Sequence, residues 1–101
     1  MSTKFSVDIT ETAEKDIEAI WNYIAQDSQR MATLFVSELE KQAGTLEHFP
    51  LRCPLIPESK SLGKEYRHLI YEKYRTVFRI AERKVTVLRV IHGSSLLESV
   101  E

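Results

Sequence analysis

The chain has 101 residues and a net charge of −1, with 43% hydrophobic and 29% charged residues. This composition excludes a mainly disordered chain and predicts one globular domain over residues 1–101. The single cysteine, Cys53, excludes internal disulfides, and no segment approaches the ~20 apolar residues of a membrane-spanning helix. We therefore expect a cytoplasmic protein.

The charge is distributed unevenly along the chain. Residues 1–59 carry five basic and ten acidic side chains, whereas residues 60–92 carry nine basic and three acidic ones. This asymmetry predicts an anionic partner for the basic half, either a nucleic acid or an acidic protein surface. The alternative is that the basic residues are simply the solvated faces of strands.

The first half of the chain predicts a strand followed by two helices. Phe5, Val7 and Ile9 alternate with polar residues, which is typical of a strand. Thr10 and Ser28 are suitable N-caps, and each precedes an apolar stripe with helical spacing. The stripes are Ala13, Ile17, Ile20, Trp21, Ile24 and Ala32, Phe35, Leu39, Ala43, Leu46. Only one or two residues separate the two expected helices, so the helices should form an antiparallel hairpin.

The second half predicts a connector and three strands. Residues 50–63 contain three prolines, so we expect neither a helix nor a central strand there. Strands are expected over Tyr66–Tyr71, Tyr74–Ile80 and Val85–Ile91, with a hairpin loop at Ala81–Lys84. The order β-α-α-β-β-β defines an α+β fold, in which the helical hairpin packs on one face of a mainly antiparallel four-stranded sheet.

The other face of this sheet is expected to stay open to solvent or to a partner. Strand alternation directs Arg75, Val77 and Arg79 to that face. Pairing Ile80 with Val85 places Val77 opposite Leu88 and Arg75 opposite Val90, with His92 just beyond on the same face. The sequence thus predicts a shared open surface of Arg75, Arg79 and His92.

This surface has two chemical interpretations. Two arginines and a histidine can hold phosphates and transfer a proton, as RNA cleavage requires, or they can dock an acidic peptide. His92 can also be a strand-end histidine bonded to nearby backbone. The scattered histidines and single cysteine form no metal-binding pattern, so we expect neither a metal nor a cofactor.

Several segments together resemble the RelE/ParE toxins of bacterial type II toxin–antitoxin modules. The start of the family's first helix is similar to TETAEKDI (10–17). The end of the helix before the family's proline-containing connector is similar to LEHFP (46–50). Similar segments also lie in the strands: YRHL (66–69), YRTVFRI (74–80) and VLRVIHG (87–93), of which the last two are the most specific. The resemblance implies the same fold and a cognate antitoxin whose C-terminal segment wraps the toxin, covering the open sheet and the helical hairpin.

The family's two branches imply different activities. In RelE-type ribonucleases of the YoeB kind, positions matching Arg75 and His92 are a phosphate-binding arginine and a strand-end histidine, but Gly93 replaces a tyrosine. Glu58 is the nearest candidate base, and only Lys60, Lys64 and Lys73 could supply the lysines of RelE-type enzymes.

The ending HGSSLL (92–97) is more similar to the ParE branch. We therefore expect a plasmid-stabilization-type toxin that inhibits DNA gyrase. The alternatives are a ribosome-dependent mRNA endoribonuclease using Arg75, Arg79 and His92, and a remnant that only binds its antitoxin.

Five basic residues are expected to contact the target or the antitoxin: Arg67, Arg75, Arg79, Arg89 and His92. Arg89 falls on the helix-facing side of the expected register. We therefore predict that it is partly buried and paired with a helix carboxylate, Asp16 or Glu38.

Overall fold

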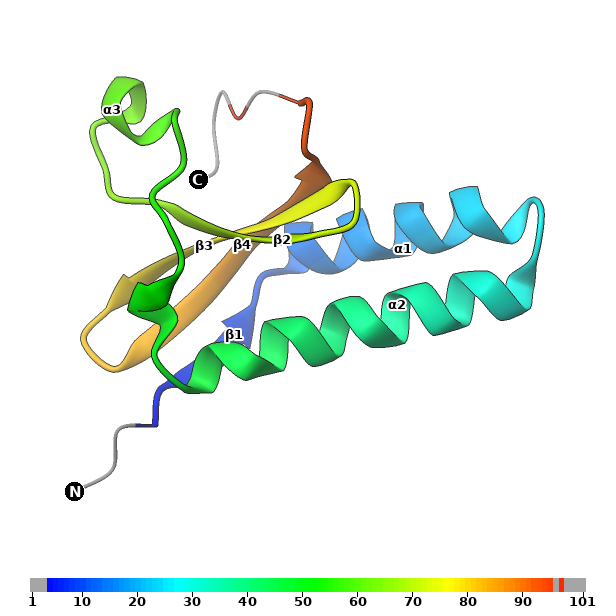
Figure 1. Cartoon of the computed structure of the whole chain (residues 1–101), viewed down its shortest axis with the longest axis horizontal. Helices are drawn as coiled ribbons and strands as arrows, with labels where there is room; N and C mark the ends of the chain where they lie inside the picture. The colour runs from blue at the N-terminus through cyan, green and yellow to red at the C-terminus, as the bar shows by residue number, and fades with distance from the viewer. Residues whose placement is uncertain (1–3, 96, 98–101) are drawn as a thin grey trace.

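The structure is a computed structural model that describes residues 4–95 and Leu97. Its elements in chain order are β1 (Ser6–Ile9), α1 (Glu11–Ala25), α2 (Gln29–Gly44), the 3₁₀ turns η1 (Thr45–Glu47) and η2 (Pro50–Arg52), α3 (Ser59–Leu62), β2 (Arg67–Tyr71), β3 (Tyr74–Ala81) and β4 (Lys84–His92) (Figure 1). The expected α+β class and element order are confirmed. Among the described residues, no helix is long and apolar enough to cross a membrane.

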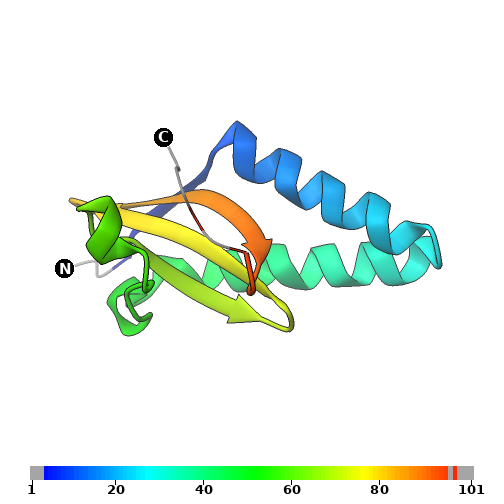
Figure 2. The same ribbon diagram turned by 90° about the horizontal axis from the view of Figure 1, so that it is seen from above.

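Both predicted helix caps are confirmed. The Thr10 hydroxyl accepts from the Ala13 N–H at 3.1 Å, and the Ser28 hydroxyl accepts from the Met31 N–H at 3.2 Å. These bonds satisfy N–H groups that the first turn of each helix leaves unpaired. The two helices form the expected antiparallel hairpin, and the turn that joins them lies beyond the end of the sheet (Figures 1 and 2).

The sheet has the strand order β1-β4-β3-β2. β1 runs parallel to β4, and the other two pairings are antiparallel. The main core lies between this sheet and the helical hairpin, where Leu46, Phe78 and Val85 are fully buried. Burial of each such side chain contributes roughly 1.5–3 kcal/mol.

The predicted register holds for only half of the β3–β4 pair. Ile80 pairs with Val85 as expected, but Ala81 already pairs with Lys84, so the loop is shorter than predicted. A β-bulge at Leu88 then shifts the pairing, so that Val77 lies opposite Arg89. By the same shift, Arg75 lies opposite Ile91 instead of Val90. The prediction was wrong there because strand alternation does not reveal an inserted residue.

The second face of the sheet is not open as predicted. Part of it is covered by a second buried cluster, which consists of Ile56, Tyr66, Val77, Leu88 and Leu97. The connector folds back over β3 and β4 and includes a short helix, α3, so the expectation that residues 50–63 contain no helix was also wrong. Both faces of β3 and β4 carry apolar residues, and covering them recovers hydrophobic free energy.

The predicted ion pair of Arg89 is confirmed. Its Nε lies 2.7 Å from Asp16 Oδ2, and its Nη2 lies 3.2 Å from Asp16 Oδ1. Asp16 Oδ2 also accepts from the Val90 N–H at 3.0 Å, on the part of β4 that extends past its pairing with β1. The pair raises the pKa of Arg89. It therefore joins α1 to the free edge of β4.

Replacing Asp16 by Asn should lower the free energy of unfolding by ~1–3 kcal/mol, because the half-buried Arg89 loses its counter-ion. Urea denaturation followed by circular dichroism measures this change. The matched control is Glu11→Gln, which breaks the exposed Glu11–Lys15 pair and should cost no more than ~0.5 kcal/mol. Equal effects of the two substitutions would contradict a structural role for Asp16.

Candidate functional site

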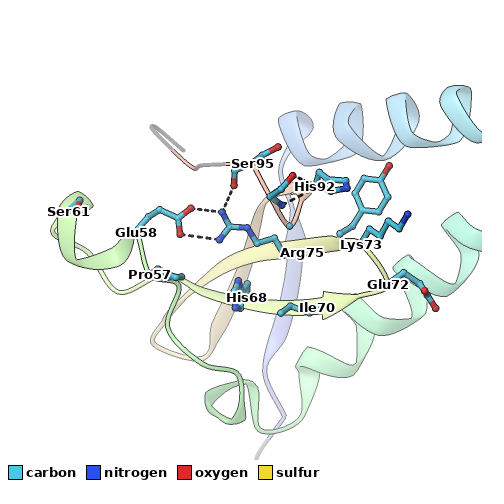
Figure 3. A pocket seen from close by; sticks show the side chains of 13 residues that line it. Pro57, Glu58, Ser61, His68, Ile70, Glu72, Lys73, Arg75, His92 and Ser95 are labelled. Atoms are coloured by element: carbon cyan, nitrogen blue, oxygen red, sulfur yellow. Dashed lines mark hydrogen bonds and ion pairs between the residues drawn. The ribbon is translucent and has the colours of Figure 1, made fainter.

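A cleft of about 580 Å³ opens at the end of the sheet where β4 terminates (Figure 3). Its walls come from the connector, from β2 and β3 with the turn between them, and from the segment after β4. The lining residues are Pro57, Glu58, Ser61, His68, Ile70, Glu72, Lys73, Tyr74, Arg75, His92, Gly93, Ser94 and Ser95. The cleft thus brings together segments that are far apart in sequence.

Arg75 lies at the base of this cleft and is only 5% exposed. Its Nη1 donates to Glu58 Oε1 at 3.1 Å, and its Nη2 donates to Glu58 Oε2 and, at 2.6 Å, to the Ser95 carbonyl (Figure 3). Glu58 Oε2 also accepts from the Leu97 N–H at 3.0 Å. The two charged groups therefore fasten the connector and the C-terminal segment to β3.

The charge state of Glu58 follows from this contact. Hydrogen bonds from Arg75 lower its pKa from the ordinary 4.5 to about 2, against the opposing effect of burial. A carboxylate with so low a pKa is ionised at neutral pH and is a weak proton acceptor. Glu58 is therefore suited to holding Arg75 and poorly suited to acting as a general base.

His92 lies at the rim of the cleft and is exposed. Its Nδ1 accepts from the Ser94 N–H at 3.2 Å and lies 2.7 Å from the Ser94 hydroxyl. The imidazole also packs edge-on against the Tyr74 ring, with the centroids 5.6 Å apart. This arrangement matches the structural alternative considered for His92, a strand-end histidine bonded to nearby backbone.

The predicted cluster of Arg75, Arg79 and His92 does not form. Arg75 and His92 line the same cleft, but Arg79 pairs with Thr86 toward the opposite end of β3. Arg75 is also buried where an open surface was expected. The bulge at Leu88 places His92 opposite Tyr74, and therefore on the other face from Arg75. Arg79 keeps its expected pairing, and the connector and Leu97 cover part of the face that was expected to be open.

The other two predicted arginines also bond within the chain. Arg67 Nη1 donates to the Cys53 carbonyl at 2.6 Å, and Arg89 pairs with Asp16. Sequence reasoning missed His68, which lies on the cleft wall. Burial and then the Arg75 charge lower its pKa. Strand alternation could have placed His68 there, since it and Ile70 share a face and Ile70 pairs with Arg75.

No group of three or more His, Cys, Asp or Glu residues that could hold a metal ion occurs among residues 4–95 and Leu97. The cleft instead offers histidine and lysine side chains beside apolar surface from Ile70 and Pro57. Such a lining suits contacts with a protein or an anionic group.

The fold is similar to that of two solved proteins of bacterial toxin–antitoxin systems. It is similar to the chromosomal ParDE toxin–antitoxin system from P. aeruginosa, with a TM-score of 0.73, 22% identity and coverage of 90% of this chain and 98% of that one. It is also similar to the toxin–antitoxin complex RelBE2 from Mycobacterium tuberculosis, with a TM-score of 0.59, 26% identity and coverage of 88% and 98%. A search of curated protein sequences gives no match.

A model of the family described as the ParE toxin of the parDE type II toxin–antitoxin system matches residues 7–97. The chain therefore belongs to the ParE toxin family of type II toxin–antitoxin systems.

The low pKa of Glu58 predicts a specific pH dependence of stability. Because the folded-state pKa lies below the ordinary value, the stabilisation is complete above about pH 5 and is lost as the pH falls toward 2. The shift corresponds to on the order of 3 kcal/mol. The difference in unfolding free energy between the wild type and Glu58→Gln should therefore shrink steadily between pH 5 and pH 2.5, as measured by urea denaturation. A constant difference would contradict the prediction.

Proposed function

We propose that this chain arrests growth by inhibiting DNA gyrase and that a cognate antitoxin neutralises it. The observation that carries the proposal is the match to the ParE toxin family over residues 7–97. The structure of the cleft supports this proposal, because the groups that a nuclease would need are occupied or dispersed.

A ribonuclease that uses a ribose 2′-hydroxyl needs a base, an acid and cations around one phosphate. Here Arg75 keeps Glu58 ionised. The Nη1 and Nη2 groups of Arg75 donate two hydrogen bonds to Glu58 and one to the Ser95 carbonyl. Arg79 lies toward the other end of β3. Of the three groups named for catalysis, only His92 remains at the surface of the cleft, which favours the gyrase proposal over mRNA cleavage.

The structure leads us to revise which residues we propose as contacts to the target or the antitoxin. Arg67, Arg79 and His92 keep partly or fully exposed side chains and are proposed to contact the target or the antitoxin. Arg75 and Arg89 are assigned to holding the fold, because each is paired with a carboxylate. We place the antitoxin over the connector, where Phe49 and Leu51 are 68% and 63% exposed.

The gyrase proposal predicts the outcome of two assays. The purified chain should inhibit supercoiling of relaxed plasmid by gyrase, and addition of the antitoxin should restore supercoiling. The same preparation should leave mRNA intact on translating ribosomes. Cleavage of mRNA without an effect on gyrase would contradict the proposal, and inactivity in both assays would indicate a remnant that binds only its antitoxin.

His92→Ala should retain growth arrest, because the proposed activity needs no proton transfer from this side chain and His92 is only one of several proposed contact residues. Growth after induction measures the effect, with His48→Ala as the control because His48 is an exposed histidine outside the cleft. If His92 were a general acid or base, its loss would lower activity by roughly a hundredfold or more. Abolished arrest with a normally folded, expressed variant would contradict the prediction.

A further inference from the structure

The outward side of α2 carries a stripe of side chains that are all exposed except the half-buried Glu38. Arg30, Met31, Leu34, Glu38 and Lys41 recur at helical spacing, and Met31 and Leu34 are 57% and 54% exposed. The buried side of the same helix is formed by Ala32, Leu39 and Ala43. The stripe is therefore a second face, in which an apolar centre is flanked by charges.

These charges are arranged symmetrically about Leu34. Arg30 precedes Leu34 by four residues and Glu38 follows it by four. If a two-fold axis passes through Leu34, a second α2 lies antiparallel and Arg30 of each copy meets Glu38 of the other. The same operation brings Lys41 toward the turn that carries Asp27 of the other copy. The stripe is thus self-complementary in charge.

The groups needed for these contacts are available. Within residues 4–95 and Leu97, no ion pair involves Asp27, Arg30, Glu38 or Lys41, and Glu38 Oε1 accepts only from Gln42. α1 lies against another flank of α2, as the bond from Trp21 Nε1 to the Thr33 hydroxyl shows. The turn of the hairpin projects beyond the sheet (Figure 2), and Tyr71 at the end of β2 borders the stripe beside Met31 and Leu34.

We propose that this stripe is an interface with a second copy of the chain, which packs α2 against α2 about a two-fold axis at Leu34. The apolar centre is small, so the interface falls in the size class of weak complexes, below ~1,200 Å². Association is therefore expected in the micromolar range, with the charges selecting the antiparallel arrangement. This proposal is independent of gyrase inhibition and concerns the toxin without its antitoxin.

Sedimentation equilibrium of the purified full chain tests the interface. Arg30→Glu and Glu38→Lys should each raise the dimer dissociation constant at least tenfold, because each places like charges together twice. The double variant Arg30→Glu/Glu38→Lys should return it to within about threefold of the wild type. The matched control is Glu40→Lys, which makes the same charge change on another side of α2 and should have no effect.

A cysteine at the axis provides a second test. Leu34→Cys should form an intermolecular disulfide under mild oxidation, because the two positions meet on the axis, whereas Glu40→Cys should not. Cys53 should not interfere, since it is buried and its thiol pKa is raised. A wild type that stays monomeric at hundreds of micromolar, a double variant that fails to recover, or equal cross-linking at both positions would overturn the proposal.

Discussion

The arrangement of the cleft depends on the ion pair between Arg75 and Glu58. Both groups are largely withdrawn from water, which costs free energy that their mutual attraction must offset. The offset is possible because the pair is bidentate and because backbone groups of Ser95 and Leu97 add two further hydrogen bonds to it. One contact therefore fixes the positions of the connector, β3 and the C-terminal segment.

This interaction also bears on the function. An arginine in a basic strand can be a phosphate ligand, but that role needs an accessible guanidinium, and Arg75 is only 5% exposed. In this chain the connector supplies a carboxylate to Arg75, and the C-terminal segment supplies a carbonyl. In this chain, which belongs to the ParE toxin family, Arg75 therefore holds the connector and the segment after β4 in place.

Local signals predicted most of the fold. Thr10 and Ser28 were recognisable as caps because a side-chain oxygen needs only N–H groups three residues away. The pairing of Arg89 with Asp16 was also predictable, because the expected register turned Arg89 toward the helices and a half-buried guanidinium requires a carboxylate.

The features that the sequence did not predict depend on contacts between distant segments of the chain. The bulge at Leu88 directs this side chain toward a buried cluster that contains Ile56 and Leu97, which belong to distant segments of the chain. One signal was present in the sequence, since the nearly continuous apolar run of Val85–Ile91 is typical of a strand buried on both faces. The partner of Arg75 had no such signal, because the position of Glu58 depends on how the connector folds.

The most direct test of the central claim is a double-mutant cycle on Arg75 and Glu58, with the free energy of unfolding as the measured quantity. Arg75→Met, Glu58→Gln and the double variant supply the three comparisons with the wild type. A coupling energy of ~2 kcal/mol or more is predicted, because each single substitution leaves the remaining partner buried without its counterpart. A coupling energy near zero would contradict the account, since the two side chains would then act independently.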